Sequence, residues 1–119
     1  MKKLLISICL LILCSICYSQ AFSIKTSYVT FKVNGEDKWQ PSISIAYNID
    51  VYDQTESIVI YNQNESLSFS VKNVQKKIIE GIEIYYFVCV NKEGKSCTLY
   101  LYKNAFYVYY PDIQYKYII

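Results

Sequence analysis

The sequence predicts an all-β fold, built as a single antiparallel meander of about eight short strands. Apolar and polar residues alternate with a period of two along most of the chain after residue 20, as in strands with one buried face. Short turn signals separate these runs, and no stretch has a convincing amphipathic helical pattern. A meander of about 100 residues hides its edges by closing into a small, lipocalin-like barrel or by folding over as a β-sandwich. We favour the barrel.

The predicted strands follow one another with short links. The first, Val29–Val33, alternates and ends at the turn dipeptide Asn34-Gly35. The second begins after Pro41, where the odd positions are apolar. A short helical turn would fit only in residues 74–79. The predicted strands are residues 29–33, 41–51, 57–61, 67–71, 82–90, 96–102, 105–110 and 113–118.

The hairpin turns fix the register of the last four strands. Residues 91–94, Asn-Lys-Glu-Gly, form a type I turn signal in which Gly94 can take the positive φ of a bulged hairpin. Cys89 then lies opposite Cys97, and the next two turns place Tyr102 opposite Ala105 and Tyr110 opposite Ile113. This register predicts a core face with the rows Phe87–Leu99–Val108–Tyr115 and Tyr85–Leu101–Phe106–Tyr117.

The opposite face of these strands carries a stripe of tyrosines. Aromatic rings offer flat stacking faces and hydroxyl groups at a low cost in side-chain entropy, so the stripe is a candidate binding surface. The alternative is a cross-strand aromatic ladder that only stabilises an exposed sheet face. A register slip of one residue would exchange the two faces. The candidate surface comprises Tyr86, Tyr100, Tyr107, Tyr109, Lys116 and Trp39.

Trp39, the single tryptophan, precedes Pro41 in the link between the first two predicted strands. It either seals one end of the core or stacks on a sugar ring. The first role is the commoner one for a large aromatic side chain.

Cys89 and Cys97 are the two cysteines beyond the first twenty residues. In an oxidising compartment, their opposed positions favour a structural disulfide worth about 2.5 kcal/mol. A metal site would need two further ligands nearby, and the spacing excludes a CxxC redox motif. The register would make them a hydrogen-bonded pair, whose wider backbone separation fits a disulfide less well.

The first nineteen residues have the pattern of a secretory signal peptide. Lys2 and Lys3 precede an apolar segment that ends in a small residue, Ser19. The segment is shorter than the roughly twenty residues of a membrane-spanning helix. Leu13 and Ile16 occupy positions where a lipidation site needs a small residue. We therefore expect residues 1–19 to be removed and residues 20–119 to form one secreted or periplasmic domain without a membrane span.

Composition excludes several classes of function. The chain contains no histidine, so it lacks an imidazole base, a histidine-activated nucleophile and a histidine metal site. It also contains no arginine, and without Lys2 and Lys3 ten lysines balance ten acidic residues. No basic patch for nucleic acid is expected from such a balance. We expect a protein that is not an enzyme and needs no metal or cofactor.

Several segments together resemble small secreted proteins of Bacteroidetes. They are the N-terminal segment running into residues 18–20, the stretch 28–30 followed by Asn34-Gly35 and Trp39, the run 58–61, the hairpin 89–97 and the tyrosine-rich end 106–119. The resemblance implies an extracytoplasmic location and a β fold, and it implies no activity.

Two classes of function fit these observations. One is a non-catalytic binding module whose ligand is a small apolar molecule, a glycan or a protein. The other is a structural, inhibitory or immunity-type partner protein that acts through the tyrosine-rich sheet face. An enclosed cavity of several hundred cubic ångströms would favour a small ligand, whereas a filled core with a flat tyrosine patch would favour a partner.

Overall fold

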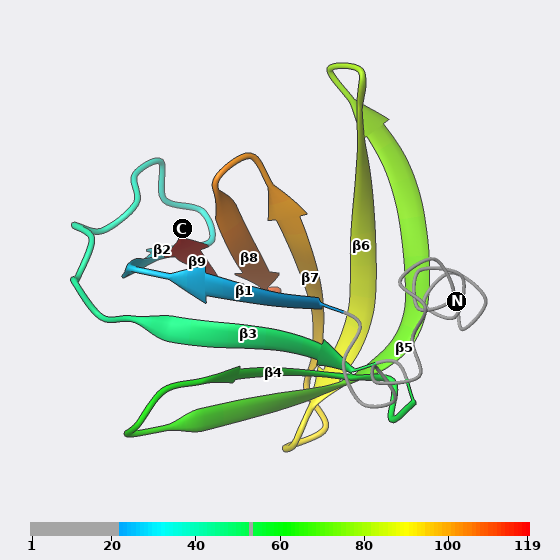
Figure 1. The fold of residues 1–119 in the computed structure, drawn as a ribbon. Coiled ribbons are helices and arrows are strands. Elements are labelled where there is room, and N and C mark those ends of the chain that lie inside the picture. Colours follow the sequence, from blue (N-terminus) through cyan, green and yellow to red (C-terminus); the bar gives the residue numbers. More distant parts are fainter. Residues whose placement is uncertain (1–21, 53) are drawn as a thin grey trace.

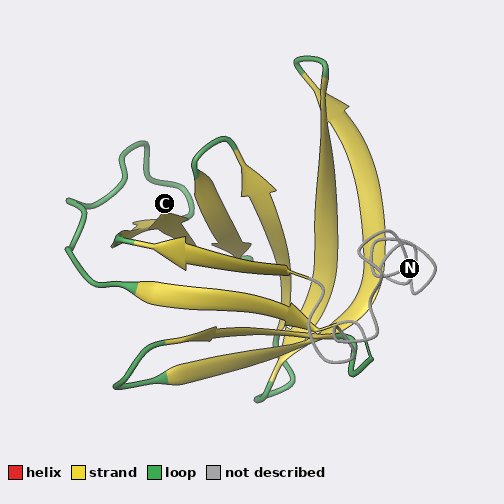
Figure 2. Cartoon of the chain, viewed as in Figure 1, coloured by secondary structure: helices red, strands yellow, loops and turns green. Residues whose placement is uncertain are grey.

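The computed structural model describes residues 22–52 and 54–119, so the expected signal peptide, residues 1–19, lies outside the described residues. The described chain is all-β, as predicted, and its strands form one antiparallel sheet that curls into a nearly closed barrel (Figures 1 and 2). The strands are β1 Phe22–Thr26, β2 Tyr28–Val33, β3 Tyr47–Tyr52, β4 Ser57–Tyr61, β5 Ser66–Ile79, β6 Ile82–Asn91, β7 Ser96–Tyr102, β8 Ala105–Tyr109 and β9 Ile113–Ile118.

From β3 to β9, each strand pairs with the next one along the chain, so the predicted meander is confirmed. The sheet has nine strands rather than the eight expected, because β1 precedes the first predicted strand. β1 pairs with β3, at one end of the meander, while β2 pairs with β9, at the other. Ser27 is the single residue between them, and its N–H donates to the carbonyl of Ile118 at 2.7 Å. One sharply bent segment thus joins both ends of the sheet.

The link between β2 and β3 is a long loop, residues 34–46, rather than the early part of a strand (Figure 1). The expected strand from Pro41 begins only at Tyr47, and Ile43 and Ile45 are exposed. The loop returns along the free edge of β2, where Val29 and Ile43 exchange backbone hydrogen bonds of 2.9 and 2.8 Å. This contact covers backbone groups that an edge strand would leave unpaired.

Residues 74–79, the one stretch where a short helical turn would fit, belong instead to β5, a strand of 14 residues. Val71 lies opposite Cys89 and Asn73 opposite Val88, so Lys72 is the extra residue of a β-bulge. A bulge shifts the alternation by one residue and reverses which positions face inward. The apolar spacing from Val71 to Val74 therefore imitates a helical period across the bulge.

The long hairpin of β5 and β6 rises well beyond the other strands (Figure 1). Glu80 and Gly81 connect its strands with φ values of 52° and 78°. Positive φ at both central residues is the mark of a type I′ turn, whose twist matches that of the flanking strands. Ile78 lies near this tip and is 68% exposed.

The predicted register of the last four strands is confirmed at each of their hairpins, while the expected Tyr85–Leu101 pair lies beyond the last pair of β6 and β7, Tyr86 with Tyr100. Cys89 lies opposite Cys97 and Tyr102 opposite Ala105, and the Tyr110 N–H donates to the Ile113 carbonyl at 2.9 Å. Leu101, expected in a core row, is 39% exposed instead, at a position of β7 where β6 no longer pairs with it. The core consists of Tyr47, Ile49, Val51, Ile58, Ile60, Phe69, Val71, Phe87, Cys89, Cys97, Leu99, Phe106, Val108 and Tyr117.

Candidate functional site

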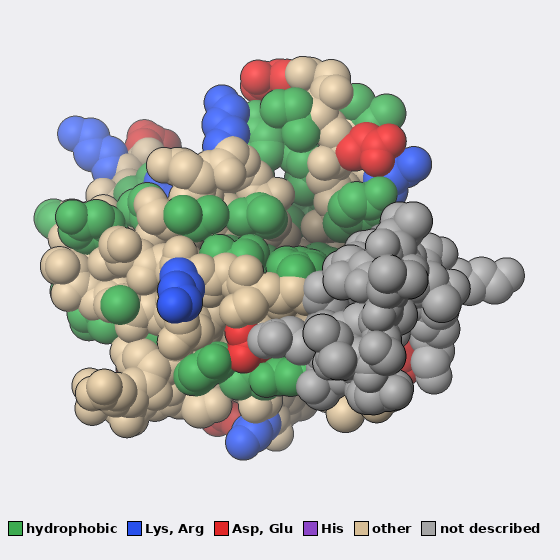
Figure 3. Space-filling model, in the orientation of Figure 1, with side chains coloured by type: hydrophobic (Ala, Val, Ile, Leu, Met, Phe, Trp, Pro, Cys, Tyr) green, Lys and Arg blue, Asp and Glu red, His purple; other side chains and the backbone are tan. Residues whose placement is uncertain are grey.

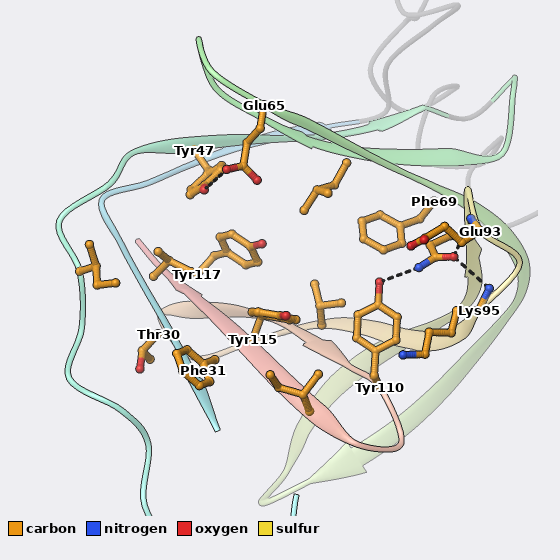
Figure 4. Close-up of a pocket in the computed structure, with 16 residues that line it drawn as sticks. Thr30, Phe31, Tyr47, Glu65, Phe69, Glu93, Lys95, Tyr110, Tyr115 and Tyr117 are labelled. Carbon is orange, nitrogen blue, oxygen red and sulfur yellow. Dashed lines mark hydrogen bonds between the residues drawn. The ribbon is translucent and has the colours of Figure 1, made fainter. Parts of the chain in front are cut away.

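The core does not fill the barrel. At the open end, a cavity of about 440 Å³, here called the barrel pocket, lies between β2, β3, β5, β8 and β9 (Figure 4). A volume of this size falls in the range of small-molecule sites. The pocket is lined by Val29, Thr30, Phe31, Ile43, Tyr47, Glu65, Leu67, Phe69, Asn91, Glu93, Lys95, Val108, Tyr110, Ile113, Tyr115 and Tyr117.

Four tyrosines form much of the wall. Tyr47 and Tyr117 pack edge to face, with ring centroids 5.2 Å apart and an interplanar angle of 84°. Tyr110 and Tyr115 form a second such pair at 6.3 Å and 87°. Edge-to-face packing aims the positive ring edge of one partner at the negative face of the other, which fixes both rings. The aromatic wall of the pocket therefore consists of two pairs of rings, and each ring is held in place by its partner.

Tyr117 lies deep in the pocket and is only 4% exposed. Its hydroxyl points into the cavity (Figure 4), and it makes no hydrogen bond with another described residue. Burial, followed by the nearby phenol of Tyr47 and carboxylate of Glu65, raises the pKa of Tyr117 well above its usual range. The pocket thus presents a neutral, buried hydroxyl that has no hydrogen-bond partner among the described residues.

Glu65 stands at the mouth of the pocket and accepts a 3.0 Å hydrogen bond from the Tyr47 hydroxyl. The turn between β4 and β5 holds it there, because the side-chain oxygen of Asn62 accepts the backbone N–H groups of Asn64 and Glu65. Such a side-chain-capped turn fixes the backbone locally. Burial, followed by the hydrogen bond to Glu65, raises the pKa of Tyr47 above its usual value.

The opposite side of the mouth is the hairpin turn between β6 and β7. The side-chain oxygen of Asn91 accepts the N–H groups of Glu93 and Lys95, each at 2.9 Å, while its amide donates to the Tyr110 hydroxyl at 3.2 Å. The Lys95 ammonium lies 3.6 Å from a carboxylate oxygen of Asp112 and 5.5 Å from the centroid of the Tyr110 ring. Asn91 therefore fixes both this turn and one ring of the pocket wall.

The predicted tyrosine stripe lies on the outer face of the barrel, as its register requires. Tyr100 is the centre, with ring centroids 4.8 Å from Tyr86 on one side and 4.8 Å from Tyr107 on the other. The rings of Tyr100 and Tyr107 are stacked with an interplanar angle of 9°. Burial raises the pKa of Tyr100 to about 12. We call these three rings the tyrosine ladder.

Trp39 lies beside the ladder and does not seal the core. Its ring is 6.1 Å from that of Tyr107, and the ammonium groups of Lys116 and Lys32 lie 4.5 and 5.6 Å from its centroid. The expectation that it closes one end of the core is wrong, because the long loop carries it over the outside of β8 and β9. Tyr109 lies on the same face and lines a shallow groove of about 310 Å³. All six residues of the candidate surface therefore share one face.

Cys89 and Cys97 are buried and directly opposed, yet they are free thiols in the structure rather than the expected disulfide. The Asn91 N–H donates to the Lys95 carbonyl, so by alternation the cysteines occupy a hydrogen-bonded pair, where the backbones are farther apart. The Cys89 thiol donates to the Phe87 carbonyl instead. Burial raises the pKa of Cys89 to about 12 and that of Cys97 to about 11.

Sequence reasoning missed the barrel pocket as a site. It assigned Tyr115 and Tyr117 to core rows, and it gave no binding role to the turn residues Glu65 and Lys95. The signal was present in the position of the tyrosines, which occupy inward positions near strand ends, where a ring can be buried and its hydroxyl left free. Whether a cavity remains between these strand ends depends on the curvature of the sheet, which the sequence pattern does not show.

Other chemistry finds little support in the described part of the chain. No three or more Cys, Asp or Glu side chains there are arranged to hold a metal ion. No helix within residues 22–52 and 54–119 is long and apolar enough to cross a membrane. On the face seen in Figure 3, charged side chains are scattered rather than gathered into one patch. Comparison with protein-family models, curated proteins and solved structures gave no match.

Proposed function

We propose that the protein is a non-catalytic binding module that holds a small, largely apolar ligand in the barrel pocket. The supporting observation is the cavity of about 440 Å³ at the open end of the barrel, walled by aromatic rings and furnished with a few polar groups. Apolar walls with a small number of placed polar groups are typical of small-molecule sites. The signal-peptide pattern of residues 1–19 further supports a place of action outside the cytoplasm.

Two leucine substitutions test the pocket. Leu67 lines the cavity and Leu101 does not, while both are 39% exposed. Leu67→Trp should fill the mouth and abolish the fluorescence gain of an uncharged apolar dye such as N-phenyl-1-naphthylamine, which a hydrophobic cavity takes up. Leu101→Trp should leave that gain unchanged. Equal dye binding by both variants, each verified as folded by circular dichroism, would refute a ligand site in the barrel.

The location has a separate test. Intact-mass measurement of protein from the extracellular and periplasmic fractions should find a chain that begins at or near Gln20. A chain that retains Met1 would contradict the proposed location, as would a lipid attached to Cys17.

Binding of a glycan or protein on the outer face is the second candidate function. It is supported by Trp39, which joins the tyrosine ladder next to two lysines. Because Trp39 is the only tryptophan, its emission reports on this face. Soluble oligosaccharides that bind there should shift the emission of Trp39, and Tyr109→Ser should weaken the shift. An emission that stays constant across a panel of oligosaccharides counts against a glycan site.

A further inference from the structure

We propose that the ligand of the barrel pocket is an organic cation, namely an apolar body carrying a primary ammonium group. This inference rests on the proposed function and names the chemical class of its ligand. The features that carry it are the tyrosine walls, the charge at the mouth and the buried hydroxyl of Tyr117.

The aromatic wall favours a cation over an anion. The rings of Tyr47, Tyr110, Tyr115 and Tyr117 line one cavity, together with Phe31 and Phe69. The faces of such rings carry negative potential, so a cation within about 6 Å of a centroid is attracted, and more strongly where water is excluded. The protein already uses this attraction at the rim, where the Lys95 ammonium lies 5.5 Å from the centroid of Tyr110.

The charged residues that line the pocket also favour a cationic ligand. Glu65 and Glu93 are its two acidic residues and Lys95 its one basic residue. The Lys95 charge is offset, because its ammonium lies 3.6 Å from the carboxylate of Asp112. Glu65 has no ion pair with a described residue, and its side-chain partner is the neutral hydroxyl of Tyr47. A ligand ammonium would supply the missing counter-charge, whereas a carboxylate would be repelled.

Tyr117 distinguishes a primary ammonium from a fully alkylated one. Its buried hydroxyl oxygen can accept an N–H hydrogen bond, and no other described residue supplies one. A buried polar group without a partner is costly, so a ligand N–H that reaches it gains affinity. A quaternary ammonium has no N–H and would use only the rings and Glu65.

Three probes with the same ten-carbon chain test the proposal by isothermal titration calorimetry at pH 7: decylammonium, decanol and decanoate, each below its micelle concentration. Decylammonium should bind at least about ten-fold more tightly than decanol, and decanoate should bind most weakly. Glu65→Gln should reduce the preference for decylammonium over decanol to less than about three-fold. Glu80→Gln, at the exposed turn of β5 and β6, is the matched control and should change nothing.

The outcomes separate the two proposals. If decanol binds as tightly as decylammonium, the pocket takes neutral ligands and the cation inference is overturned while the binding function stands. If none of the three probes binds, the proposed function itself fails. Full retention of the cation preference in Glu65→Gln would also overturn the inference, provided that its urea unfolding shows a native fold.

A second variant keeps the test independent of the Glu65 turn. Tyr117→Phe keeps the ring and removes only the hydroxyl, so it should weaken decylammonium about three-fold and leave decyltrimethylammonium unchanged. Unchanged binding of decylammonium would overturn the choice of a primary ammonium.

Discussion

Asp50 shows how a buried carboxylate can serve the sheet. It is 4% exposed and accepts hydrogen bonds from Ser23 at 2.6 Å, Tyr61 at 2.9 Å and Tyr52 at 3.2 Å. Ser23 belongs to β1 and Tyr61 to β4, while Tyr52 lies on β3, the strand that also carries Asp50. A buried carboxylate is costly unless it is hydrogen-bonded, and here three hydroxyl groups satisfy it. Asp50 thus ties the bent first strand to the start of the meander.

Replacement of Asp50 should be costly. Asp50→Ala leaves three hydroxyl groups without their acceptor, and we expect the free energy of unfolding to fall by about 2–3 kcal/mol in urea titrations. Asp112→Ala removes only the exposed ion pair with Lys95 and should cost less than about 1 kcal/mol. Similar losses in the two variants would show that the Asp50 hydrogen bonds contribute little.

The buried cysteines should behave as protected thiols. With pKa values raised to about 12 for Cys89 and about 11 for Cys97, almost no thiolate forms near neutral pH, and thiolate is the reactive species. Native protein should therefore react slowly with a thiol reagent at pH 8, and denatured, unreduced protein should yield two thiols once the signal peptide is gone. A denatured sample without reactive thiol would mean that the disulfide forms after all.

At the scale of elements, hairpins were easier to predict than the segments around them. Gly94 and the turn after Tyr102 determine a register by local geometry alone, and the structure has both as expected. The bulge at Lys72 and the loop carrying Trp39 depend on distant partners, Val88 in one case and the free edge of β2 in the other. A local sequence pattern cannot reveal such contacts. The predicted strand at β5 therefore stopped too early, at residue 71, and the predicted strand at β3 began too early, at residue 41.

The same limit applies to the candidate site. The tyrosine ladder could be predicted to lie on one face, because the register of neighbouring strands determines which residues are cross-strand pairs. The barrel pocket unites the β4–β5 turn at Glu65 with the distant strand carrying Tyr117, and its volume depends on how the sheet curves. Curvature is a sum over many residues and has no short sequence signature.

The tyrosine ladder should stabilise the sheet through its central ring. Tyr100→Ala removes contacts with both Tyr86 and Tyr107, each worth about 0.5–1.5 kcal/mol, so the unfolding free energy should fall by about 1–3 kcal/mol. Tyr109→Ala is the control, since its ring is exposed and stacks on no other described ring. It should cost less than about 1 kcal/mol. Equal losses in chemical denaturation would refute a structural role for the stacking.

For the whole molecule, the pKa values of the buried phenols predict a loss of stability in alkali. Burial raises the pKa of Tyr117 above its unfolded value of 10.0 and that of Tyr100 to about 12. The folded state holds the phenol protons of these tyrosines more tightly than the unfolded state does. The protonated phenols therefore contribute fully to the free energy of unfolding below pH 10, and this contribution is lost as the pH rises toward 12. The thermal midpoint, followed by circular dichroism, should therefore fall steadily above pH 10.

Tyr117→Phe isolates the deepest phenol. The variant should be about as stable as the wild type at pH 7, because the hydroxyl has no partner among the described residues. Its thermal midpoint should fall less steeply above pH 10. Tyr28→Phe, at an exposed position, should follow the wild-type curve. An unchanged slope in Tyr117→Phe would mean that this phenol does not contribute to alkaline unfolding.

The bend at Ser27 predicts an order of events during folding. The hairpins from β3 to β9 join neighbours in sequence and can form quickly, whereas β2 must find β9 across nearly the whole chain, with Tyr28 meeting Ile118. Contacts between such distant residues form slowly because loop closure costs entropy. Until β2 docks, the edge of β9 offers unpaired backbone groups to any passing strand. We therefore expect self-association of this protein to begin from a state in which the meander has folded but the barrel has not yet closed.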